Sequence, residues 1–106
     1  MTDSGIAAPA ADCLPSAYDL TFDGFDDRDI MDFEEYLTVF AGYREHRPVS
    51  AGVKHHRYWY RACITPARLK RNLTRMLEHL SLKALVRQSG QAFELRKLSV
   101  RGQARN

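Results

Sequence analysis

Alternation of apolar and polar residues with a period of two marks two segments of this chain as strands. Residues 18–22 read Tyr-Asp-Leu-Thr-Phe and stop at an Asp-Gly pair, which predicts a turn. In residues 56–64, one side of the strand carries Tyr58, Tyr60, Ala62 and Ile64. The other side carries Arg57, Trp59, Arg61 and Cys63. Because the more apolar side of a strand packs on the core, we expect Trp59 to point away from it.

Apolar residues spaced three and four apart mark two helices. The first begins at Asp26 or Asp27, both suited to cap a helix, and ends near Gly42. Its apolar stripe consists of Ile30, Phe33, Leu37 and Phe40. The second follows Thr65, a capping residue, and Pro66 at the first helical position, and it runs to about residue 82. Its apolar stripe consists of Leu69, Leu73, Met76, Leu77 and Leu80.

Three further segments have weaker strand patterns. Residues 43–52 contain Pro48, which a sheet tolerates mainly at an edge, so this strand is expected to be peripheral. Residues 83–88 and 91–98 are separated by Ser89 and Gly90, which predict a hairpin turn. The chain therefore ends in a hairpin that follows the second helix.

The order strand, helix, strand, strand, helix, strand is the split βαβ pattern of ferredoxin-like folds. We therefore predict an α+β class: a ferredoxin-like βαββαβ sandwich with two helices on one face of an antiparallel sheet, plus a C-terminal hairpin extension. In that fold the second strand lies at an edge, whereas the first and third pair in the middle. A single domain is expected over residues 17–98. Residues 1–16 and the basic residues 99–106 are expected to be disordered tails.

The net charge of +3 hides a strong asymmetry along the 106 residues. Residues 1–42 hold ten acids and one base, a net of −9, whereas residues 43–106 hold three acids and fifteen bases, a net of +12. Such asymmetry suits pairing within the fold, head-to-tail docking on a neighbour, or a basic surface for an anionic partner. Since the predicted fold places the acidic helix beside the basic one, much of the charge is expected to be neutralised internally.

Cysteine spacing and hydropathy bear on where the chain resides. Cys13 and Cys63 form no C-x-x-C motif and no disulfide framework, so both are expected to be free thiols. No apolar run approaches the roughly 20 residues needed to span a bilayer. Residues 1–16 lack the basic and apolar regions of a secretory signal. A cytoplasmic location is therefore expected.

The sequence contains no recognisable set of catalytic or metal-binding residues. Its histidines, His46, His55, His56 and His79, lack the spacing of a metal site. The carboxylates between Asp26 and Glu35 cluster at a helix start, where capping and the helix dipole account for them. The chain has no G-x-S-x-G motif, no P-loop and no G-x-G-x-x-G motif. We expect no enzymatic activity, no cofactor, no metal and no small-molecule substrate.

The best candidate for a binding surface is the polar side of the strand at residues 56–64. Tryptophan and arginine dominate the energetics of protein interfaces, so Arg57, Trp59 and Arg61 have the composition of an interaction hot spot. The alternative is that the C-terminal hairpin or a tail covers Trp59, while the two arginines pair across the sheet with Asp19 and Asp23.

Nucleic-acid binding is the second candidate. The predicted sheet resembles the RNA-recognition fold, but residues 57–61 lack its glycine and aromatic spacing, and Asp19 and Asp23 would repel phosphates. A stripe on the second helix, Arg68, Arg71 and Arg75, could contact phosphates without sequence preference, or could be a solvated face balanced by the first helix. We therefore expect a non-enzymatic protein-interaction or assembly module, self-associating through the sheet face or through its acidic and basic halves. The alternative is a nucleic-acid-binding protein that uses the basic C-terminal half.

Overall fold

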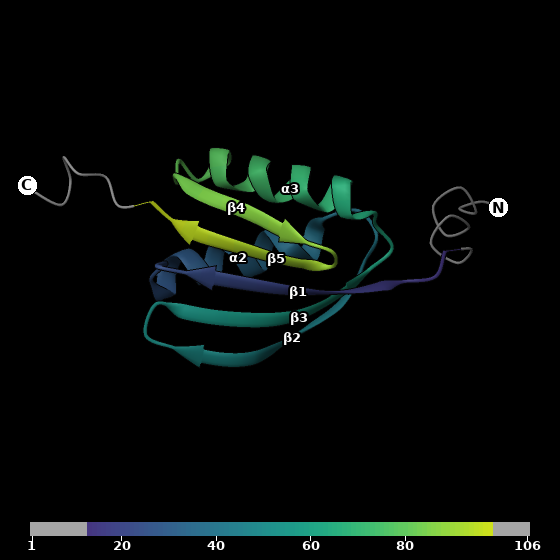
Figure 1. Ribbon diagram of the computed structural model, residues 1–106, viewed down its shortest axis with the longest axis horizontal. Helices are drawn as coiled ribbons and strands as arrows, with labels where there is room; N and C mark the ends of the chain where they lie inside the picture. The colour runs from purple at the N-terminus through teal and green to yellow at the C-terminus, as the bar shows by residue number, and fades with distance from the viewer. Residues whose placement is uncertain (1–12, 99–106) are drawn as a thin grey trace, which may run out of the picture.

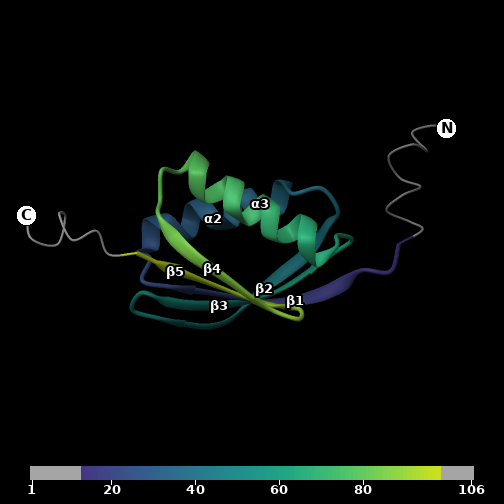
Figure 2. The ribbon, with the colours of Figure 1, turned by 45° about the horizontal axis from the view of Figure 1, so that its top comes forward.

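Strands and helices build a two-layer α+β fold, in which both helices lie on one face of a single sheet (Figures 1 and 2). The computed structural model describes residues 13–98, so the predicted tails fall almost wholly outside the described residues. Within that range the elements are β1 (Ser16–Asp23), α2 (Asp27–Val39), β2 (Tyr43–Gly52), β3 (His55–Ala62), α3 (Pro66–His79), β4 (Ala84–Ser89) and β5 (Ala92–Lys97). Every predicted element is present, and each differs from its expected bounds by only a few residues.

The strands are ordered β2-β3-β1-β5-β4 in the sheet. β3 pairs antiparallel with both β1 and β2, so the prolyl strand lies at an edge and β1 and β3 lie side by side, as predicted. The ferredoxin-like order is wrong in the other half of the sheet. β5 lies between β1 and β4 and pairs with β1 in parallel, so the sheet is mixed instead of antiparallel.

Burial explains why the terminal hairpin enters the sheet instead of extending it. On β5, Phe93 and Leu95 are buried beneath the helices, and they fill the core next to β1. On β4, Leu85 stays 45% exposed. The strand with more apolar surface to bury therefore takes the inner position, and the more polar strand becomes the edge. The sequence pattern predicted both strands, but it did not predict which of them would be the inner strand.

Both helices begin at the predicted capping residues. The backbone N–H of Asp29 donates to the Asp26 carboxylate at 2.9 Å, and the Asp29 side chain accepts in return from the Asp26 N–H at 3.4 Å, which completes a capping box. Thr65 accepts from the backbone N–H of Arg68 at 3.3 Å, ahead of Pro66 in the first helical turn. These caps fix where each apolar stripe starts.

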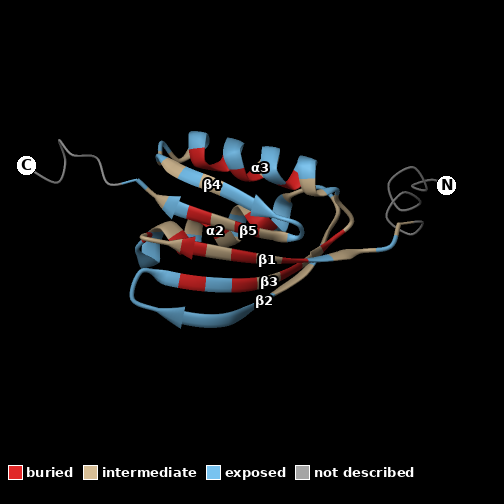
Figure 3. Ribbon diagram, in the orientation of Figure 1, coloured by how far each residue is buried: buried red, intermediate tan, exposed pale blue. Residues whose placement is uncertain are grey.

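The core lies between the helices and the sheet, as Figure 3 shows by the buried positions along β1, β3 and β5. Tyr58, Tyr60 and Ala62 are all buried on the helix side, which confirms the predicted orientation of β3. The Tyr60 hydroxyl donates to the backbone carbonyl of Leu37 at 2.8 Å and so joins β3 to α2. Burial raises the pKa of Tyr60 well above its usual range.

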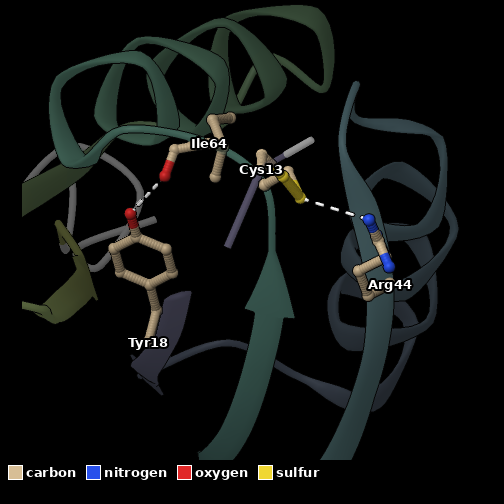
Figure 4. The surroundings of a disulfide bond; sticks show 5 residues. Cys13, Tyr18, Arg44 and Ile64 are labelled. Carbon is tan, nitrogen blue, oxygen red and sulfur yellow. Dashed lines mark hydrogen bonds between the residues drawn. A yellow bond between two sulfur atoms is a disulfide. The ribbon is translucent and has the colours of Figure 1, made fainter. Parts of the chain in front are cut away.

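The prediction of two free thiols is wrong, because Cys13 and Cys63 form a disulfide with their Cα atoms 6.0 Å apart (Figure 4). The Arg44 guanidinium lies 3.4 Å from the Cys63 sulfur, and the Tyr18 hydroxyl donates to the carbonyl of Ile64 nearby. The bond ties the start of the described chain to the end of β3. Disulfides persist mainly in oxidising compartments, so the cysteines do not support the predicted cytoplasmic location.

Candidate functional site

The face of the sheet opposite the helices presents a layer of polar side chains around Trp59. We call it the open sheet face. Strand register places on it Asp19, Thr21 and Asp23 of β1, Arg57, Trp59 and Arg61 of β3, Glu45 and Arg47 of β2, and Ala92, Glu94 and Arg96 of β5. Trp59 is half-buried there, whereas its neighbours Tyr58 and Tyr60 are in the core. The predicted outward orientation of Trp59 is therefore confirmed.

Trp59 lines a shallow depression of about 350 Å³. Lining residues come from all five strands and include Ala17, Val49, Trp59, Ser89 and Ala92. The Arg47 guanidinium lies 4.9 Å from the centroid of the Trp59 ring, a cation–π distance. Val49 remains 53% exposed beside it. The depression therefore combines a large aromatic ring and small apolar side chains with polar ones, Asp19, Arg57 and Gln91, and the terminal hairpin lines it without covering Trp59.

The two predicted arginines are both held by carboxylates, but only one takes the expected partner. Arg57 forms a two-pronged pair with Asp19, at 2.9 and 2.7 Å, and these hydrogen bonds raise the pKa of Arg57. Arg61 pairs instead with Glu45 of β2, at 3.0 Å. Asp23, the partner expected for Arg61, lies against His55 at 3.5 Å and Arg96 at 3.8 Å.

Sequence reasoning missed Arg47 and Val49, which complete the surroundings of Trp59. Both lie in β2, where Pro48 made the strand pattern weak. The register between β2 and β3 shifts after Tyr43 and again after Pro48, so plain alternation does not give their orientation. The sequence carries no signal for this placement, because the two register shifts appear only once β2 is paired with β3.

The acidic residues of α2 do not neutralise the basic residues of α3, contrary to expectation. Glu34 lies 3.4 Å from His46 of β2, Asp27 lies 3.8 Å from His56 of β3, and Asp29 lies 3.5 Å from Lys97 of β5. Within residues 13–98, no ion pair connects the two helices. The acidic charge is therefore directed at the strands, and the basic charge of α3 is left on the surface.

The predicted anion-binding residues Arg68, Arg71 and Arg75 are all exposed on α3. Two of them also line a groove of about 590 Å³ between α3 and the edge strand β4. Its lining consists of Ala67, Lys70, Arg71, Thr74, Arg75, Glu78 and Gln88. The structure thus places the two candidate surfaces on different parts of the molecule, the open sheet face and the α3–β4 groove.

A chain of polar side chains links α2 to β2 on the helix side. The Tyr43 hydroxyl lies 2.9 Å from Nδ1 of His46, whose Nε2 faces Glu34 at 3.4 Å. Burial, together with the charge and hydrogen bonding of Glu34, raises the pKa of Tyr58 to about 12. These contacts hold the edge strand against α2. In the described part of the chain, no cluster of three or more histidine, cysteine or carboxylate side chains could hold a metal ion.

No helix among residues 13–98 has the length and apolar character needed to cross a membrane. The chain matches no protein-family model, and a search of curated proteins finds no significant relative.

Proposed function

We propose that this chain is a non-enzymatic protein-interaction or assembly module that binds its partner through the open sheet face. The observation that supports this most is the position of Trp59, which lies half-buried in a shallow depression of the open sheet face, with Arg57 and Arg61 on the same strand already paired. Tryptophan at the centre of a shallow pocket, surrounded by polar groups, is the usual anatomy of an interface hot spot.

The charges of this face favour a protein over a nucleic acid. Arg57 and Arg61 are engaged by Asp19 and Glu45, so neither cation is free for a phosphate. Asp23 and Glu94 add further carboxylates to the same face. A polyanion approaching Trp59 would meet Arg47, which lies over the ring, but around it carboxylates and arginines that already pair with one another, so this face offers little net positive charge.

The partner that these charges fit is a second copy of the chain. The β2–β3 half of the open sheet face holds three arginines and one acid: Arg47, Arg57, Arg61 and Glu45. The half formed by β1, β5 and the edge strand β4 holds three acids and two arginines: Asp19, Asp23, Glu94, Arg87 and Arg96. A two-fold rotation about an axis parallel to the strands places each half against its opposite on the other molecule. The two Trp59 depressions then meet near the axis.

Sedimentation of Trp59→Ala beside the unaltered chain tests this proposal. The substitution should weaken self-association by about 2 kcal/mol or more, roughly 30-fold in Kd, because it removes the anchor of the interface. Met31→Ala is the matched control, since Met31 is 65% exposed on α2, in the helix layer. A chain that stays monomeric at high concentration, or a Trp59→Ala variant that associates as the control does, would contradict the proposal.

A further inference from the structure

Four basic side chains of α3 lie at the surface and form no ion pair with a carboxylate of residues 13–98. They are Arg68, Lys70, Arg71 and Arg75, and we call them the α3 cation group. Among the ion pairs of residues 13–98, none includes a member of this group. By contrast, Arg57 and Arg61 of the open sheet face each pair with a carboxylate. Positive charge on α3 is therefore available to an external anion.

The arrangement of the group is regular because it follows one helix. Arg68, Arg71 and Arg75 are spaced by three and four residues and so project from one side of α3, with a rise of about 1.5 Å per residue. Lys70 lies toward the β4 edge and joins Arg71 and Arg75 along the α3–β4 groove. Gln88 of β4 adds a side-chain amide, and Glu78 is the one acid among the groove's lining residues. The result is a line of cations beside a channel.

The chemistry of α3 points to a phosphodiester backbone and not to a lipid surface. The apolar stripe of this helix, Leu69, Leu73, Met76 and Leu77, is buried in the core and cannot enter a bilayer. Among the described residues, those that line the groove include no aromatic side chain on which a base could stack. Contacts would therefore reach phosphates only, which predicts binding that is indifferent to base sequence.

We propose that the α3–β4 groove is a sequence-independent binding site for the nucleic-acid backbone, formed by the α3 cation group. This surface is separate from the open sheet face, where Arg57, Arg61 and Arg96 pair with carboxylates. The site does not depend on the Trp59 interface, so each proposal can fail without the other.

Fluorescence anisotropy with a short labelled DNA duplex, measured over a range of salt concentrations, tests this proposal. Four phosphate contacts predict a slope of about −3.6 in a plot of log affinity against log salt. Affinity should therefore fall about 100-fold between about 50 and about 200 mM salt. Duplexes of different sequence should give the same affinity. A chain that binds no duplex at the lower salt concentration overturns the proposal.

The variant Arg71→Gln/Arg75→Gln tests whether the groove makes these contacts. Each lost cation should lower the slope by about 1, which leaves a slope of about −1.8. The matched control is Arg28→Gln/Lys54→Gln, which removes the same net charge from exposed positions in α2 and in the β2–β3 turn. Melting curves of both variants check that they fold. The control should keep the unaltered slope.

Two results would contradict the groove as the site. Equal slopes for the two double variants would show that binding follows net charge and not the α3 cation group. If the chain does not bind DNA but self-associates through Arg71 and Arg75, the α3 cation group binds the acidic α2 of a second copy instead.

Discussion

A strand leaves only two directions for a side chain, so on β3 Tyr58 and Tyr60 face the core and Trp59 faces away. The ion-pair partner of Arg61 depends on more than this alternation. Glu45 comes within 3.0 Å of Arg61 only because β2 shifts its register after Tyr43, and a bulge of this kind leaves no mark in the hydrophobic pattern.

Leu73 tests the packing of α3 at the level of one side chain. It is fully buried beneath the helix, so Leu73→Ala should lower the free energy of unfolding by about 2–5 kcal/mol, through lost burial and the cavity left behind. Thr74→Ala is the control, because the neighbouring residue is exposed and alanine favours a helix. Urea unfolding of the two variants compares them. Equal stabilities would mean that the buried side of α3 is assigned wrongly.

Asp26 links the cap of α2 to pH. Its hydrogen bond from the Asp29 backbone N–H is the main cause of a pKa lowered from the usual 3.8. A carboxyl whose pKa is lowered on folding stabilises the fold above its unfolded pKa and loses this contribution as pH falls through the folded value. Asp26→Asn keeps the capping acceptor but cannot titrate. We therefore expect the stability gap between the two proteins to shrink below about pH 4, and a gap that widens with acid would refute this role.

At the scale of elements, the sequence predicted each strand and helix but not where the terminal hairpin enters the sheet. The capping residues Asp26 and Thr65 act on neighbouring backbone groups, so the start of each helix could be predicted from the local sequence. The position of β5 depends on how much of Phe93 and Leu95 is buried relative to β4, which is a property of the whole core. The pairing of Cys13 with Cys63 was equally hidden, because 50 residues separate them and the fold alone brings them together.

The disulfide should stabilise the fold by restricting the unfolded chain. For a separation of 50 residues, chain entropy predicts that Cys13→Ser lowers the free energy of unfolding by up to about 4 kcal/mol. The double variant Cys13→Ser/Cys63→Ser should lose no more than the single variant, since the bond is removed only once. Denaturant unfolding with and without reductant measures both. A stability that reductant leaves unchanged in the original chain would show that the bond contributes nothing.

At the scale of the whole molecule, charged side chains that form ion pairs and charged side chains that do not lie on different surfaces. Acidic residues of α2 contact histidines and lysine on the strands, and arginines of the open sheet face pair with neighbouring acids. The α3 cation group is outside both arrangements. Counting charges along the sequence revealed the asymmetry, but only the fold shows which cations are paired. On that distinction rest our two proposals, a protein partner for the open sheet face and a phosphate backbone for the α3–β4 groove.

The central claim is that Trp59 anchors an interface with a second copy of the chain. Trp59 is the single tryptophan among the 106 residues, so its fluorescence reports on the open sheet face alone. Emission recorded during dilution, beside sedimentation of the same samples, measures the burial of the ring directly. We predict a red shift on dilution with the same midpoint as dissociation, because the ring leaves the interface for water. A chain that dissociates with unchanged emission, or never associates, would contradict the account.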